Sequence, residues 1–164
     1  MKNLAKKLCI LLWLVSLCAA LVSCGADYVD SVPAYDLAVS ASSSFVTDGG
    51  TKVLDEDVIL EFDEDGIVDG LIDFTVIKAN NAKNINEIGI FRAEKANRAD
   101  IEEMVKKYVD NLVRTYRSMN YFPEEVEKID CATVKVFGNY VVYSFLNEVD
   151  TEAFHNALEA QIKK

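Results

Sequence analysis

Two patterns of hydrophobic and polar residues along the chain predict two kinds of element. The segments Leu71–Ile77 and Glu87–Arg92 are rich in β-branched and aromatic residues, which is typical of strands. Two further segments of this kind, Thr133–Phe137 and Tyr140–Leu146, flank Gly138-Asn139. A two-residue loop of that composition between strand-like segments predicts a β-hairpin.

Between the two strand pairs, apolar residues return at helical spacing from Ile101 to Met119. They form one stripe of a helix: Ile101, Met104, Val105, Tyr108, Leu112, Val113, Tyr116 and Met119. Asp100 is placed to cap this helix. Pro123 blocks its continuation, because proline lacks the backbone N–H that a helix interior requires. A final helix, capped by Asp150 or Thr151, is expected to follow the hairpin.

The resulting order is roughly β-β-α-β-β-α, which predicts the α+β class. One mainly antiparallel sheet, covered by the long amphipathic helix and by the C-terminal helix, would bury the apolar faces of all these elements. We expect residues 47–164 to form this single compact domain. Its size is ordinary for one hydrophobic core.

The N-terminal segment has a different character. Lys2, Lys6 and Lys7 precede an apolar run from Leu8 to Leu21, the order of a secretory signal. The run is too short for a comfortable membrane span, which needs about 20 residues. It ends in Leu21-Val22-Ser23-Cys24, a lipobox whose cysteine thiol receives a diacylglyceryl group. We therefore expect residues 1–23 to be a lipoprotein signal peptide, and residues 24–46 to be the lipidated Cys24 and a partly helical tether.

Removal of this signal changes the charge and the cysteine chemistry. Loss of its three lysines would take the formal net charge from −10 to −13. Such an acidic chain is not expected to bind nucleic acid, which selects clustered Lys and Arg. The two acyl chains on Cys24 would suffice for anchoring without a basic patch. Cys131 would remain as the sole free thiol, so no intramolecular disulfide is expected.

Carboxylates in the segment 61–69 are spaced like the first ligands of a calcium-binding loop. The candidate ligands are Glu61, Asp63, Asp65 and Asp69. However, Ile72 occupies the position where such a loop requires a bidentate Glu. The alternating segment Val53–Phe62 also predicts a strand, not a helix, before the loop. We expect a solvated acidic turn and no metal, with a weak calcium site as the alternative.

No pattern in the chain carries a recognisable catalytic set. Cys131 and His155 are the one Cys–His pair left after processing, and a thiolate nucleophile needs such a base nearby. We expect a buried structural thiol and a surface His instead of a dyad. The chain lacks a Gly-rich phosphate loop and the Gly-x-Ser-x-Gly motif of serine hydrolases. We therefore expect no enzyme and no cofactor.

Three segments carry a resemblance to a known family. They are Glu87-Ile88-Gly89-Ile90-Phe91, Tyr121-Phe122-Pro123-Glu124-Glu125, and Val136 to Val142 across the Gly-centred hairpin. Together with the long helix, they resemble the domain-of-unknown-function family 4358, small lipoproteins found mostly in low-GC Gram-positive bacteria. The resemblance implies an envelope lipoprotein with a compact α+β domain. It implies no activity and no catalytic residue.

These observations lead to one expected function and two alternatives. We expect a protein anchored by lipid to the outer face of the bacterial cytoplasmic membrane, with an extracytoplasmic domain. That domain is expected to be a non-catalytic interaction module for another envelope protein or a wall component. The alternatives are a small envelope hydrolase that uses carboxylates and a weak calcium-binding module.

Overall fold

The computed structural model describes residues 27–42, 51–53, 69–81, 83–119 and 123–164. Their elements in chain order are α2 (Ala34–Ala41), β1 (Thr51–Val53), β2 (Leu71–Ala79), β3 (Glu87–Ala93), α4 (Arg98–Ser118), α5 (Pro123–Asp130), β4 (Thr133–Phe137), β5 (Tyr140–Phe145) and α6 (Glu148–Ile162). The four strands predicted at Leu71–Ile77, Glu87–Arg92, Thr133–Phe137 and Tyr140–Leu146 are confirmed as β2, β3, β4 and β5. The strand expected over Val53–Phe62 lies outside the described residues except at Val53.

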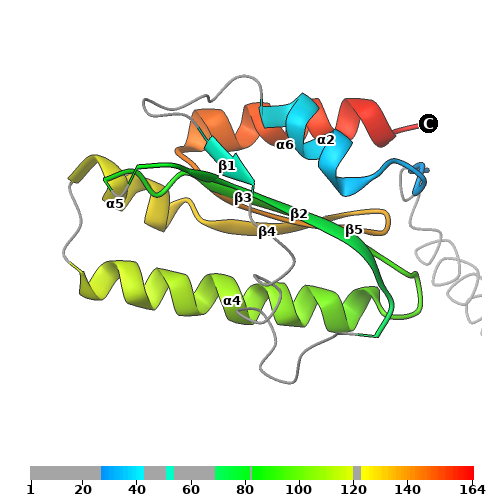
Figure 1. Cartoon of the computed structure of the whole chain (residues 1–164), viewed down its shortest axis with the longest axis horizontal. Coiled ribbons are helices and arrows are strands. Elements are labelled where there is room, and N and C mark those ends of the chain that lie inside the picture. Colours follow the sequence, from blue (N-terminus) through cyan, green and yellow to red (C-terminus); the bar gives the residue numbers. More distant parts are fainter. Residues whose placement is uncertain (1–26, 43–50, 54–68, 82, 120–122) are drawn as a thin grey trace, which may run out of the picture.

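The strands form one sheet in the order β1-β2-β3-β5-β4, and every neighbouring pair is antiparallel. Figure 1 shows three layers, with α2 and α6 on one face of the sheet and α4 on the other. The predicted α+β class, with one antiparallel sheet covered by a long helix and a C-terminal helix, is therefore confirmed.

Each face of the sheet has its own hydrophobic core, because alternate strand residues point to opposite faces. On the α2–α6 face, Ile88, Tyr140 and Val142 pack against Leu37 and Leu158. On the α4 face, the core is built from Phe91, Val141, Tyr143 and Phe145 with the apolar stripe of the long helix. All six residues of β5 are buried, which explains why that strand reads as a nearly continuous apolar run.

A buried carboxylate lies inside the core on the α4 side. Glu87 is 1% exposed, and its Oε1 accepts hydrogen bonds from the hydroxyls of Tyr108 (2.9 Å) and Tyr143 (2.6 Å). Lys78 Nζ lies 3.3 Å from Oε2, an ion-pair distance without the alignment of a hydrogen bond. A buried charge is tolerated when it is paired and hydrogen-bonded, so these three contacts account for its position.

Gly89 makes this arrangement possible. It is the cross-strand partner of Tyr143, and the ring of that tyrosine lies directly over the glycine. A Cβ atom at position 89 would overlap the ring atoms Cε1, Cδ1 and Cζ. The glycine is therefore required for the close approach of the ring and not for a special backbone angle.

Three local features differ from the sequence predictions. The long helix has Asn97 at its N-cap without a side-chain cap hydrogen bond, so the prediction of Asp100 as the cap was wrong. The final helix is capped by Asn147, whose side chain accepts a hydrogen bond from the backbone N–H of Asp150. A further helix, α5, begins at Pro123, because proline suits the first turn of a helix.

The compact part of the chain begins well before residue 47, where the sequence analysis placed its boundary. Helix α2 lies in the range expected to be a tether, and its residues Ala34, Leu37, Ala38 and Ala41 are at most 1% exposed. Residues 27–29 also contact the end of α6. Val29 N donates to Ile162 O at 2.7 Å, and Tyr28 pairs with Lys163 in an isolated bridge. These residues are part of the packed domain.

We predict that Gly89→Ala destabilises the fold, because the new methyl group must displace the Tyr143 ring from Glu87. Overpacking of this kind costs about 1–3 kcal/mol of unfolding free energy. Urea denaturation of the single variant and of the double variant with Tyr143→Val would measure it. The smaller side chain should restore part of the loss, and strictly additive effects of the two substitutions would contradict the proposed contact.

Candidate functional site

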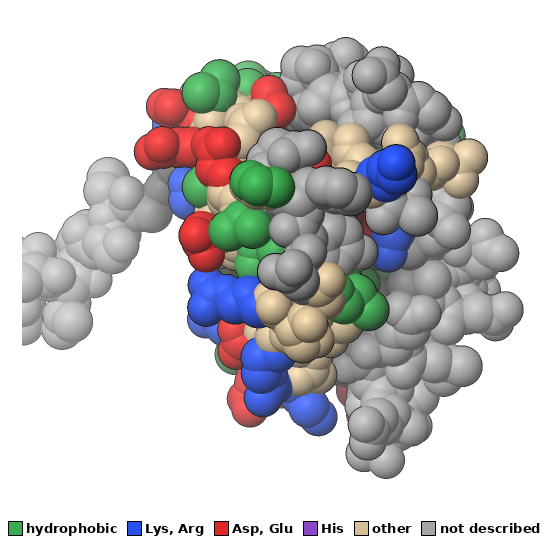
Figure 2. Space-filling model, turned by 90° about the vertical axis from the view of Figure 1, so that its left-hand side faces the viewer, with side chains coloured by type: hydrophobic (Ala, Val, Ile, Leu, Met, Phe, Trp, Pro, Cys, Tyr) green, Lys and Arg blue, Asp and Glu red, His purple; other side chains and the backbone are tan. Residues whose placement is uncertain are grey.

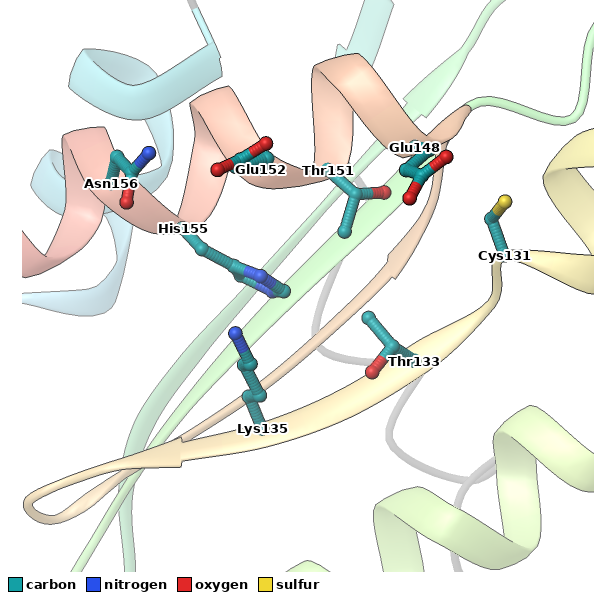
Figure 3. A pocket seen from close by; sticks show the side chains of 8 residues that line it. All are labelled: Cys131, Thr133, Lys135, Glu148, Thr151, Glu152, His155 and Asn156. Atoms are coloured by element: carbon teal, nitrogen blue, oxygen red, sulfur yellow. The ribbon is translucent and has the colours of Figure 1, made fainter.

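A surface pocket of about 510 Å³ lies between α6 and the edge strand β4. One wall comes from residues 131–135 and the other from α6, and the hairpin and β5 join these two segments along the chain. The lining residues are Cys131, Thr133, Lys135, Glu148, Thr151, Glu152, His155 and Asn156. Figure 3 shows the α6 side chains on one wall and those of β4 and Cys131 on the other.

The local structure explains why these side chains converge. In β4, Thr133 and Lys135 share the face of Phe137, which packs in the α2–α6 core. Val134 and Val136 point the other way and pack against the α4 core. Because β4 is the last strand of the sheet, α6 covers its inner part and leaves polar side chains along the edge. On α6, residues 148, 151, 152 and 155 fall on one helical face.

His155 is the most unusual member of the pocket. It is 6% exposed, and its Nε2 atom has no hydrogen-bond partner in the described part of the chain. The rings of Phe137 and Phe154 lie 5.7 Å and 5.6 Å from the imidazole, centre to centre. Burial, and then the nearby charge of Lys135, lower the pKa of His155 from 6.5 to about 4. The imidazole is therefore neutral near pH 7.

Lys135 supplies a positive charge at the same end of the pocket. Its side chain and the ring of His155 point toward one another across the space between β4 and α6 (Figure 3). Lys135 is exposed, and no ion pair joins it to a carboxylate among the described residues. An ammonium group and an unpartnered imidazole nitrogen therefore share one corner.

The opposite end of the pocket is acidic. Cys131 and Glu148 lie together there, away from Lys135 (Figure 3). Burial raises the pKa of the Cys131 thiol, and the charges of Glu127, Glu148 and Asp130 raise it further. Figure 2, which looks onto this end of the molecule, shows a cluster of acidic side chains on the side of the α6 layer.

The expectation for the Cys–His pair was wrong in its placement of both residues. Cys131 is half-buried, not fully buried, and His155 is buried, not on the surface. The two line one pocket, but Glu148 and Thr151 lie between them (Figure 3). A thiol of raised pKa is mostly protonated near pH 7, which disfavours attack by a thiolate.

The remaining predicted sites contribute nothing to this pocket. Cys24, Glu61, Asp63 and Asp65 lie outside the described residues, and Asp69 is an exposed turn residue just before β2. Over residues that the structure describes, no group of three or more His, Cys, Asp or Glu side chains could hold a metal ion. The calcium hypothesis for the segment 61–69 stays a prediction.

Sequence reasoning considered Cys131 and His155 as site residues but not Lys135 or Glu152, and it considered Thr151 only as a helix cap. A usable signal was present in two periodicities. The period of two in β4 places Thr133 and Lys135 on one face, and the helical period of α6 aligns Glu148, Thr151 and His155. What the sequence could not provide was that these two faces meet.

Comparison with known proteins gave one finding. A family model described as Domain of unknown function (DUF4358) matches residues 66–146, which extend from just before β2 to just after β5. No curated protein and no solved structure matches the chain. The match includes Cys131, Thr133 and Lys135, whereas the α6 wall of the pocket follows it.

We predict that His155 makes the fold sensitive to acid. The unfolded chain binds a proton at His155 below about pH 6.5, but the folded chain does so only near its lowered pKa of about 4. The stability due to the neutral residue is therefore lost as the pH falls through this window. The unfolding free energy of the wild type minus that of His155→Gln should fall between about pH 7 and about pH 4.5.

Urea denaturation at both pH values measures this difference. Asn156→Gln is the matched control, because Asn156 lines the same pocket, is exposed and does not titrate. The difference in unfolding free energy between the wild type and Asn156→Gln should be independent of pH. A constant difference for His155→Gln as well would contradict the assignment of a buried neutral imidazole.

Proposed function

We propose that this chain, whose residues 66–146 match the family model DUF4358, is a lipid-anchored envelope protein whose domain is a non-catalytic binding module. The family description names no activity, so the argument depends on the residues themselves. The observation that carries the proposal is the lipobox Leu21-Val22-Ser23-Cys24 directly after a basic and then apolar segment. Diacylglyceryl transfer to Cys24 would anchor the protein at the outer face of the cytoplasmic membrane.

No helix in the described part of the chain is long and apolar enough to cross a membrane. The apolar run Leu8–Leu21 lies outside that part. Under this proposal, membrane attachment depends on the lipid on Cys24.

The anchor would hold the domain close to the membrane in a fixed orientation. Asp27 is already part of the packed structure, because its carbonyl accepts a hydrogen bond from the N–H of Lys164 at 2.9 Å. Only Gly25 and Ala26 separate it from Cys24. Three residues span at most about 11 Å. The end of the domain that carries the hairpin turn Gly138-Asn139 and the C-terminus would therefore face the lipid (Figure 1).

Binding without catalysis is supported by the chemistry of the pocket. The thiol of Cys131 has a raised pKa, and the imidazole of His155 has a lowered pKa, so neither is activated for nucleophilic attack by the other. The lining is polar and carries charges of both signs. A pocket of this kind recognises a ligand by charge and hydrogen bonding. Such a ligand would come from the envelope, on the outer side of the membrane.

We predict that Cys24→Ala abolishes lipid labelling and membrane retention, because no other residue in the lipobox can accept the diacylglyceryl group. Incorporation of a tagged fatty acid and partition into a detergent phase would measure both. Cys131→Ala is the matched control, since it removes the other mature cysteine and should retain both properties. Detergent partition of Cys24→Ala equal to that of the wild type would refute the anchor.

We also predict that the hairpin end lies near the lipid and the β2–β3 loop does not. Trp13 is the only Trp of the chain and leaves with the signal, so a single new Trp reports its own surroundings. Asn139→Trp in vesicles of brominated lipid should be quenched strongly. Lys83→Trp, at the other end of the sheet, is the control. Equal quenching at both positions would exclude the short-tether orientation.

A further inference from the structure

The geometry points to a specific class of ligand for the pocket between α6 and β4. We propose that it binds a small zwitterion, a free amino acid or a short peptide. The ligand carboxylate would lie against Lys135 and His155, and the ligand ammonium group would lie toward Glu148. The inference depends on the proposed binding role of the domain and assigns that role to this pocket.

The first argument comes from the unpartnered nitrogen of His155. The side chain is 94% buried by area, its Nε2 has no partner among the described residues, and its ring points into the pocket. A buried polar atom without a hydrogen bond costs about 1–3 kcal/mol. A ligand oxygen would supply the missing acceptor if Nε2 carries the imidazole proton.

The second argument concerns the sign of the charge at this corner. The ammonium group of Lys135 faces the same space, and it forms no ion pair with any carboxylate in the described residues. A metal cation would be repelled by this charge. A carboxylate can accept a charge-assisted hydrogen bond from the lysine and a second one from the imidazole. The ligand group at this corner is therefore an anion.

The third argument concerns the opposite corner. Glu148 lines the pocket there and is exposed. The charges of Glu127, Glu148 and Asp130 all act on Cys131 in the same direction, which shows a negative potential around this thiol. Arg117 compensates Asp130 by an ion pair of 2.9 Å, whereas Glu127 and Glu148 have no such partner among the described residues. An ammonium group fits this corner.

The two corners together define a bipolar pocket. A simple anion would satisfy Lys135 and His155 but leave the acidic end unused, and a simple amine would do the reverse. A molecule with both charges uses both ends. The volume of about 510 Å³ lies within the roughly 300–1,000 Å³ of small-molecule sites. This space is sufficient for an amino acid or a short peptide.

Isothermal titration of the purified full-length lipoprotein in detergent with glycine, glycylglycine and triglycine tests the proposal. The tightest of the three is then compared with its N-acetyl form, which keeps only the carboxylate, and with its C-terminal amide, which keeps only the ammonium group. We expect each capped form to bind about tenfold more weakly, the loss of one charge-assisted contact. Equal affinity of a capped form would overturn the zwitterion assignment.

Variants of the lining residues test which end of the pocket binds the ligand carboxylate and which end binds the ammonium group. Lys135→Gln and His155→Phe should weaken the zwitterion and the N-acetyl form, because both probes carry the carboxylate. Glu148→Gln should weaken the zwitterion and the amide but spare the N-acetyl form. Lys107→Gln removes the same charge from the exposed side of α4 and should leave the affinities for all three probes unchanged. Equal weakening by Lys107→Gln would show non-specific charge effects and refute the site.

Two further measurements keep the outcomes distinct. Melting temperatures of all variants test folding, and His155→Gln replaces His155→Phe if the latter does not fold. Membrane retention of each variant is scored in the cells from which it is purified. Retained protein without saturable binding would overturn the zwitterion pocket and leave the lipid anchor intact. Saturable binding by protein that is not retained would support the pocket and contradict the anchor.

Discussion

The buried carboxylate of Glu87 is the interaction on which the arrangement of this fold depends. It is located on β3, accepts hydrogen bonds from Tyr143 on β5 and Tyr108 on α4, and lies at ion-pair distance from Lys78 on β2. A charge in the core is costly unless it is paired, so each of these partners must be in register for the fold to be stable. Removal of one partner leaves an unpaired buried charge, which costs more stability than replacement of the whole set by apolar residues. Gly89 belongs to the same constraint, because it leaves the space through which the Tyr143 ring reaches the carboxylate.

The position of α4 on one face of the sheet has a consequence for the other face. With α4 fixed by Tyr108 and its apolar stripe, α2 and α6 must cover the opposite face alone. They do so over the central strands, where Leu37, Phe154 and Leu158 are completely buried. At the edge strand β4 the cover is incomplete, and polar side chains replace apolar ones. The pocket is thus a product of the same packing that stabilises the core, and its polar lining is stable because water reaches most of it.

The N-terminal segment connects this architecture to the proposed location of the protein. Residues 27–29 contact the end of α6, and the Tyr28 hydroxyl donates to Glu159 at 3.0 Å. Farther along, the Tyr140 hydroxyl donates to the carbonyl of Val32 at 2.9 Å. Asp73 accepts a hydrogen bond from the N–H of Ala34 and also pairs with Arg92. Because several hydrogen bonds join this segment to the rest of the domain, a lipid on Cys24 would orient the whole domain. The acidic corner of the pocket, near the start of α6, would then lie at the end away from the lipid (Figure 1).

The sequence by itself determined the elements whose signals are local. The β-branched and aromatic content of β2 and β3, the Gly138-Asn139 hairpin and the helical stripe from Ile101 were sufficient for the α+β class, because each reflects a surface that must be buried. The sequence did not determine α5, the caps Asn97 and Asn147, or the packing of α2, since these depend on where neighbouring elements end. It also could not bring Lys135 and His155 together or leave the imidazole nitrogen without a partner. Only the tertiary structure decided those features, because they arise where the edge of the sheet meets α6. Long-range packing determines that contact, and the spacing of residues along the chain does not.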